Sequence, residues 1–86
     1  MNDLLEYLLK SIIDHPDDLS ISEERDEELV RYNIHLNDQD YPKVIGKRGL
    51  TIKAIQEMLQ IYSRKTAPDD FTRIYLNVTS EETGQD

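Results

Sequence analysis

One short segment constrains the chain more than any other: Gly46-Lys47-Arg48-Gly49 lies between two stretches with helical patterns. Glycine tolerates positive φ and has no Cβ, so two glycines three residues apart predict a tight turn that another backbone can approach. The first N–H groups of the following helix lack partners within the helix, and its dipole favours an anion there. With two cations between the glycines, the pattern predicts a phosphate-binding loop.

A purely structural interpretation of the two glycines is the alternative. Gly46 would then be the C-cap of the preceding helix, and Gly49 would be a turn residue. The pattern alone does not separate the two interpretations. The loop's position between two helical segments, with an alternating strand before it and another strand later, favours the phosphate-binding one.

The distribution of charge points to the same region. The formal net charge of the 86-residue chain is −8. Residues 41–66 nevertheless hold six cations and one acid, whereas the rest of the chain holds four cations and seventeen acids. The Debye length at physiological salt is about 8 Å, so distant exposed acids are largely screened at the loop. A local cationic patch is therefore expected, made of Lys43, Lys47, Arg48, Lys53, Arg64 and Lys65.

Composition narrows the class of protein. A chain of 86 residues forms one small domain with a modest core. It has no cysteine, so it has neither a disulfide framework nor a thiolate metal site, as suits a reducing cytoplasm. We expect no membrane insertion, because no apolar run is long enough and the N-terminus lacks a basic start. No spacing suits a catalytic or metal-ligating cluster, so we expect no enzyme, metal or cofactor.

Periodicity predicts a helix and a hairpin in the first half of the chain. Pairs of leucine and isoleucine recur every four residues over residues 4–13, which is typical of an amphipathic helix. We expect His15-Pro16 to end it, because the residue before a proline disfavours the α region. Alternating residues 19–22 and 30–36 predict two strands, joined by a charged turn over residues 23–28.

The second half predicts two helices and a strand. Asn37, Asp38 and Asp40 are candidate caps for a short helix before Gly46. A longer helix is expected from about residue 50 to about residue 64, and a strand over residues 74–78, after a loop at 67–70. The longer helix carries a core stripe of Ile52, Ile55, Leu59 and Tyr62, and a second apolar stripe of Ala54, Met58 and Ile61. We place one domain at residues 1–79 and a disordered acidic tail at 80–86.

These elements and motifs resemble a known family. An α+β order of helix, strand, strand, helix, helix, strand, with three helices on one face of a three-stranded sheet, resembles a single type II KH domain. Asp14-His15-Pro16-Asp17 after an amphipathic helix, and Lys43 to Gly49 followed by Thr51-Ile52 and Ala54-Ile55, resemble the KhpA family of small bacterial KH proteins. Leu50 departs from the family pattern, which usually has a polar or basic residue there.

The resemblance implies a cytoplasmic, non-catalytic protein that binds single-stranded RNA, because the GxxG loop of KH domains clamps nucleotides. It also implies RNA chaperoning or post-transcriptional regulation linked to cell elongation and envelope growth. Gly46 and Gly49 would shape the loop, and Lys47 and Arg48 would meet phosphates. Lys43 and Lys53 would flank the clamp, and Ile45 and Ile52 would line the groove or, as readily, belong to the core.

The resemblance further implies a homodimer or a pair with a KhpB-type (Jag/EloR) KH protein. The stripe of Ala54, Met58 and Ile61 is the expected dimer interface, unless the sheet and the first helix cover it in a monomer. An alternative function follows: a small acidic interaction subunit that pairs with another KH protein and has little RNA binding of its own.

Overall fold

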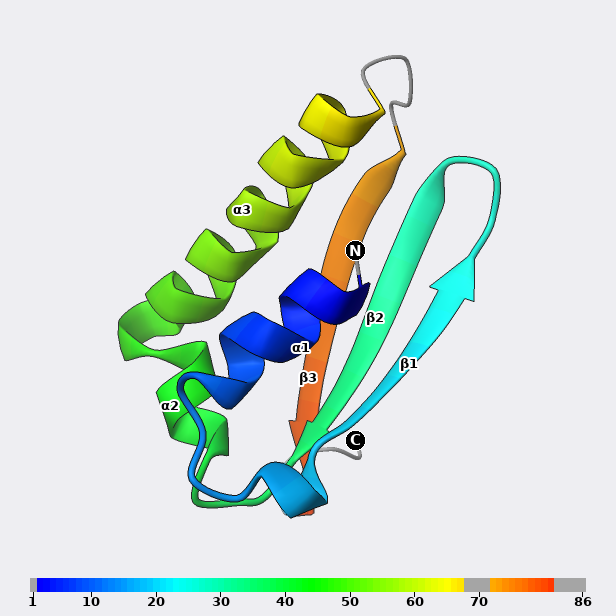
Figure 1. The fold of residues 1–86 in the computed structure, drawn as a ribbon. Coiled ribbons are helices and arrows are strands. Elements are labelled where there is room, and N and C mark those ends of the chain that lie inside the picture. Colours follow the sequence, from blue (N-terminus) through cyan, green and yellow to red (C-terminus); the bar gives the residue numbers. More distant parts are fainter. Residues whose placement is uncertain (1, 68–71, 82–86) are drawn as a thin grey trace.

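The computed structural model describes residues 2–67 and 72–81 and contains the predicted order of elements (Figure 1). Short 3₁₀ turns at Pro16–Asp18 and Lys47–Gly49 connect some of them. The helices and strands are α1 (Asn2–Lys10), β1 (Ser20–Arg25), β2 (Leu29–Leu36), α2 (Tyr41–Ile45), α3 (Leu50–Thr66) and β3 (Arg73–Ser80).

The three strands form one mixed sheet in the order β1-β2-β3. β1 pairs antiparallel with β2, with Ser20 opposite His35. β2 pairs parallel with β3, with Val30 opposite Ile74. Parallel neighbours need a long crossover, and α2 and α3 supply it. In Figure 1, α1 lies across the sheet and α3 runs alongside β3.

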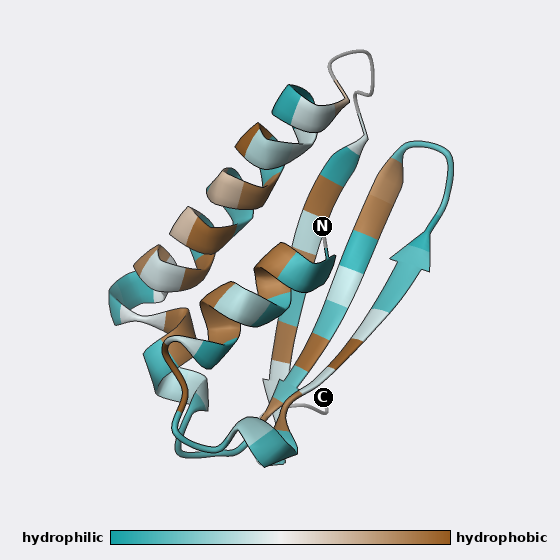
Figure 2. Cartoon of the chain, in the orientation of Figure 1, coloured by the Kyte–Doolittle hydropathy of each residue, from teal (hydrophilic) through white to brown (hydrophobic). Residues whose placement is uncertain are grey.

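Alternation along β2 decides which face of the sheet is buried. Val30, Tyr32, Ile34 and Leu36 are at most 3% exposed, whereas the residues between them are not buried. Figure 2 shows apolar residues recurring along the strands and helices. The predicted core stripe of α3 is confirmed at Ile55 and Leu59, and on β3 Ile74 is buried while Leu76 is partly buried. The helices also contribute Leu5, Leu9 and Val44.

The hairpin turn is shorter than predicted. β1 continues through Arg25 and pairs with β2, so the prediction of a charged turn from residue 23 was wrong. The side chain of Asp26 accepts hydrogen bonds from the N–H groups of Glu28 and Leu29, both at 3.0 Å. This Asx-type turn closes the hairpin over residues 26–28, and alternation of apolar residues does not reveal it because β1 is largely exposed.

Two features of the helices also differ from the prediction. α1 ends at Lys10 rather than at His15, although N–H groups of Ile12 and Ile13 still reach Leu9. Tyr62 is 42% exposed, and Ser63 takes the core position instead, because the buried stripe of α3 steps by four residues from Ile55.

The second stripe of α3 is exposed, so the sheet and α1 do not cover it. Met58 is 50% exposed and Ile61 is 66% exposed. At the other end of the chain, β3 runs through Ser80, one residue beyond the expected domain end. Residues 82–86 of the expected tail and 68–70 of the expected loop lie outside the described residues.

Candidate nucleic-acid site

The loop between α2 and α3 has three residues with positive φ. Gly46 has φ 76° and ψ 180°, a region essentially restricted to glycine, and Gly49 has φ 75° and ψ 15°. Arg48, at φ 57° and ψ 28°, is the only described non-glycine residue with positive φ. That conformation costs an L-residue about 1–2 kcal/mol. Strain of this kind is concentrated at ligand-binding sites, so the loop is a candidate site on its backbone alone.

The two glycines have different surroundings. A Cβ at Gly46 would lie 2.6 Å from the Cβ of Thr51 and 2.8 Å from its backbone nitrogen, so Gly46 packs against the first turn of α3. A Cβ at Gly49 would meet nothing within 4 Å. Gly46 is therefore required for packing, whereas Gly49 leaves an open surface that a ligand backbone can approach.

The capping role expected for Gly46 is confirmed, and the phosphate-binding role stays a prediction. Gly46 is the C-cap of α2, and its N–H donates to the carbonyl of Pro42 at 2.9 Å. The N–H of Gly49 donates to the carbonyl of Gly46 at 3.2 Å and closes the turn. These capping bonds use backbone groups and leave the open space at Gly49 unfilled, so capping does not exclude a ligand there.

The cations of the loop and of the start of α3 are exposed. Lys47, Arg48 and Lys53 form no ion pair with any other residue in the described part of the chain. An unpaired cation keeps its full charge for an incoming phosphate, and the open position at Gly49 directly follows Lys47 and Arg48 in the chain. The structure thus brings together the residues that the sequence assigned to phosphate contact.

Lys43 differs from Lys47, Arg48 and Lys53, because it forms ion pairs with two acids. Its Nζ contacts the carboxylate of Asp14 and lies 3.6 Å from Oδ1 of Asp40. The hydrogen bond to Asp14, followed by the charges of both acids, holds the pKa of Lys43 above its ordinary value. The lysine anchors α2 to the chain that follows α1, and its role in flanking a ligand stays a prediction.

Sequence reasoning missed the central residue of this anchor, Asp40. Its fully buried carboxylate accepts the N–H groups of Asp14, at 3.0 Å, and His15, at 2.8 Å. Burial opposes its ionisation, but these N–H donors, His15 and Lys43 outweigh burial and hold its pKa below the ordinary value. Asp40 is the N-cap residue of α2, as one of the three candidates, but its side chain makes no cap hydrogen bond there. A partner 25 residues away leaves no periodic signal.

The Asp14-His15-Pro16-Asp17 motif therefore has a structural use. Besides the backbone bonds to Asp40, Nε2 of His15 lies 3.0 Å from Oε1 of Gln39. Asn37 Nδ2 donates to Asp18 Oδ2 at 2.9 Å. These contacts join the turn after α1 to the segment before α2, which in turn holds the start of the glycine loop.

The two candidate groove residues lie in different surroundings. Ile45 and Ile52 are both half-buried. Ile52 packs against the core cluster, as the core alternative expects, whereas Ile45 is not among the residues of that cluster. Both therefore retain surface beside the loop.

A groove between α3 and β3 was not predicted. Gln56, Gln60 and Arg64 line one wall of this hollow of about 380 Å³, and Arg73, Ile74 and Tyr75 line the other. Gln60 donates to the carbonyl of Thr72 at 3.1 Å and accepts the N–H of Ile74 at 3.2 Å, while Gln56 accepts the N–H of Leu76 at 3.4 Å. The two glutamines thus pair with three backbone groups along the free edge at the start of β3. Their spacing of four residues was the available signal.

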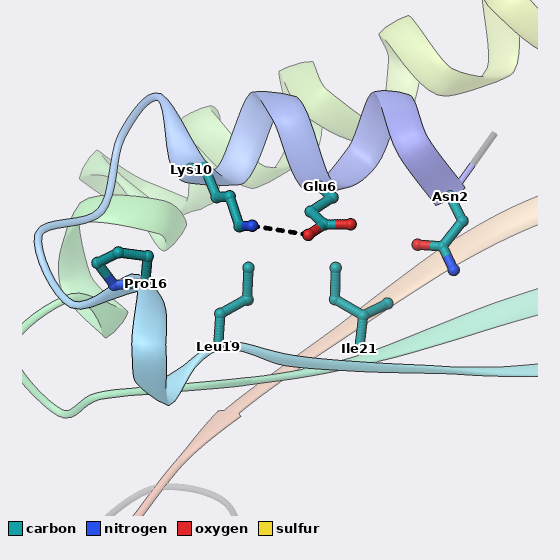
Figure 3. Close-up of a pocket in the computed structure, with 6 residues that line it drawn as sticks. All are labelled: Asn2, Glu6, Lys10, Pro16, Leu19 and Ile21. Carbon is teal, nitrogen blue, oxygen red and sulfur yellow. Dashed lines mark ion pairs between the residues drawn. The ribbon is translucent and has the colours of Figure 1, made fainter.

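A second hollow, of about 270 Å³, lies between α1 and β1 (Figure 3). Glu6 and Lys10 project into it and form an ion pair at 2.8 Å. One cation matched by one acid does not favour a polyanion.

In residues 2–67 and 72–81, no group of three or more histidine, aspartate or glutamate side chains has a metal-binding arrangement, and no helix has the length and apolar character needed to cross a membrane.

Comparison with known proteins agrees with this geometry. The family described as KhpA/KhpB, KH domain matches residues 2–78. The RNA-binding protein KhpA of Oceanobacillus iheyensis is 36% identical over 78 residues, which cover 91% of this chain and 99% of the relative. Its namesake in Thermotoga maritima is 39% identical over 59 residues, covering 69% of this chain and 79% of the relative. The Bacillus subtilis protein of that name is 34% identical over 56 residues, covering 65% and 69%.

The mixed sheet with α1, α2 and α3 against one face confirms the predicted α+β fold, a single type II KH domain. The match spans the turn after α1, the glycine loop and most of β3. The chain therefore belongs to the KhpA/KhpB family of KH domains.

Proposed function

We propose that this protein is a non-catalytic binder of single-stranded RNA that holds the phosphate backbone at Gly46–Gly49. The observation that carries the proposal is the loop itself, where exposed Lys47 and Arg48 form no ion pair within the described residues and precede an open Gly49. A KH domain clamps nucleotides through such a loop, and the relatives are named as RNA-binding proteins. Acids elsewhere limit non-specific binding.

In this proposal the loop residues have separate roles. Lys47 and Arg48 neutralise phosphates, Gly49 lets the RNA backbone approach, and Lys53 adds charge from the first turns of α3. Ile45 and the exposed part of Ile52 provide an apolar floor for bases. Lys43 flanks the clamp and positions α2.

Reversing the loop charges tests the proposal. The variant Lys47→Asp with Arg48→Asp should lose affinity for a short single-stranded RNA, measured by fluorescence anisotropy. The matched control is Lys10→Asp with Arg25→Asp, which changes the net charge equally but alters cations that pair with Glu6 and Glu23. The control should bind within a few-fold of the wild type. Equal affinities of both variants would contradict the clamp.

Salt dependence gives a second measure of the same contact. If about three phosphates are neutralised, the slope of log affinity against log salt concentration should be about −2 for a single strand. The loop variant should flatten this slope, and the control variant should retain it. A wild-type slope near zero would contradict phosphate binding.

For the cellular role, the family resemblance supports a cytoplasmic RNA chaperone or post-transcriptional regulator linked to cell elongation and envelope growth. Sequencing the RNA that crosslinks to the tagged protein in cells would test the RNA-binding part of this role. Measuring cell length after deletion of the gene would test the link to elongation. Enrichment of no RNA over an untagged control would contradict the RNA-binding part.

The exposed stripe of α3 favours a second function, that of an interaction subunit. Met58 and Ile61 are large, apolar and at least half exposed, and Ala54 shares their face. Such a face suits a two-fold homodimer or a KhpB-type partner. Ile61→Asp should reduce the mass measured by light scattering, whereas Tyr7→Asp, at an exposed tyrosine of α1, should not. A monomeric wild type at high micromolar concentration would exclude the homodimer.

A further inference from the structure

On the sheet face opposite the helices, β2 and β3 form a patch to which they contribute arginines but no acidic residues. β2 and β3 contain no aspartate or glutamate, although the chain has 18 of them. Their outward-facing residues include Arg31, Asn33, Arg73, Tyr75 and Asn77, all at positions that alternate with the core. Acids are thus absent from these two strands of a strongly acidic protein, which favours a negatively charged ligand for this face.

Tyr75 is the aromatic residue of the patch. It is 44% exposed and pairs in register with Arg31 on β2, while Arg73 is its neighbour on the same face of β3. Among the described residues, Arg31 forms an ion pair with one acid, Glu24 of β1, at 3.5 Å. Both members of that pair are about half exposed or more, so the pair contributes little and does not remove the arginine from an incoming phosphate.

The neighbouring asparagines add hydrogen-bonding groups. Asn77 Nδ2 donates to Asn33 Oδ1 at 3.2 Å, which uses one polar atom of each side-chain amide. The other polar atom of each amide is left for a ligand. An aromatic ring can stack on an unpaired base, guanidinium groups can contact its phosphates, and amide groups can hydrogen-bond to the base edge.

The patch is continuous with the groove beside α3. Tyr75 lines both the groove of Gln56 and Gln60 and the hollow of about 560 Å³ on the outer face. The other wall of the groove is α3, which begins at the glycine loop. From Leu50 to Arg64 the helix rises about 20 Å, so this wall runs from the glycine loop along the groove.

We infer that the outer face of β2 and β3 is a second contact for single-stranded RNA, in which a base stacks on Tyr75 and Arg31 and Arg73 contact the adjacent phosphates. The inference rests on the proposed function, because it requires one RNA strand to run from the glycine loop along the α3–β3 groove to this face. It explains why the strands are free of acids, and it makes affinity depend on RNA length.

The test compares RNA of about four nucleotides, the length that a KH loop clamps, with RNA of about ten. Tyr75→Ala should weaken binding of the longer RNA about tenfold or more, as expected for one lost stacking contact, and leave the shorter RNA within twofold. Tyr75→Phe keeps the ring and should bind both as the wild type does. Tyr7→Ala, at the exposed tyrosine of α1, is the matched control. Thermal unfolding checks that each variant is folded.

The outcomes separate this inference from the proposed function. If Tyr75→Ala binds the longer RNA as tightly as the wild type while the Lys47, Arg48 double variant does not, the second contact is wrong and the loop clamp stands. If the double variant still binds both lengths, the proposed function itself is wrong, and the inference falls with it. If Tyr75→Ala lowers the mass in solution instead of the affinity, the face contacts a second protein copy, and the inference is again overturned.

Discussion

The two ends of the five-residue helix α2 use charge in opposite ways. At its start, buried Asp40 accepts two backbone N–H groups, and Lys43 pairs with Asp14 and Asp40. At its end, Lys47 and Arg48 have no ion-pair partner among the described residues, and the backbone adopts strained angles. Satisfied polar groups fix a structure, whereas unsatisfied groups are available to a ligand. The first end anchors the second.

Replacing each glycine by alanine should separate the two kinds of constraint within the loop. Gly46→Ala should cost about 3 kcal/mol or more of unfolding free energy, because its conformation is restricted to glycine and its Cβ would clash with Thr51. Gly49→Ala should cost only about 1–2 kcal/mol, because the new Cβ would contact no other atom and the cost is that of holding alanine in a left-handed conformation. Urea unfolding measures both.

Measuring the RNA affinity of the same glycine variants tests their roles in binding. Among folded molecules, Gly49→Ala should weaken binding of a short single strand, because its new methyl group occupies the open surface. A Gly49→Ala variant that is unchanged in affinity, or that is destabilised as much as Gly46→Ala, would contradict the assignment of different roles to the two glycines.

Breaking the anchor should have the next largest effect. Asp40→Ala leaves the N–H groups of Asp14 and His15 without their acceptor and should lower the unfolding free energy by about 2–3 kcal/mol. Asp17→Ala, at an exposed neighbour in the same turn, is the control and should change stability by less than about 0.5 kcal/mol. If Asp40→Ala is as stable as the control, the buried carboxylate does not anchor α2.

A smaller effect should appear in acid. The pKa of Asp40 is lower in the folded protein than in the unfolded chain, so the unfolded chain binds more protons near the ordinary carboxyl pKa of about 4. The contribution of Asp40 to stability is therefore complete above that pH and is lost as the pH falls through the folded pKa. Asp40→Asn should reduce the slope of stability against pH in this range. An unchanged slope would show that other carboxyls dominate it.

Patterns in the sequence predicted the elements and the glycine loop because these depend on neighbours in the chain. Apolar alternation located Ile34 and Ile74, and the two glycines located the turn before α3. The partners of Asp40 and the pairing of Lys43 with Asp14 were missed, because they join segments 25 to 29 residues apart. Tyr62 was misplaced because a stripe with spacings of three and four fits its position and that of Ser63 almost equally.

RNA binding at the glycine loop is tested by an amide NMR titration with a single-stranded RNA of about eight nucleotides, a length within the usual range for such sites. We expect the largest shift changes at the N–H groups of Lys47 to Thr51. We expect small changes at Asp14 and His15, whose N–H groups already bond to Asp40. Large changes at Asp14 and His15 with an unperturbed glycine loop would contradict binding at the loop.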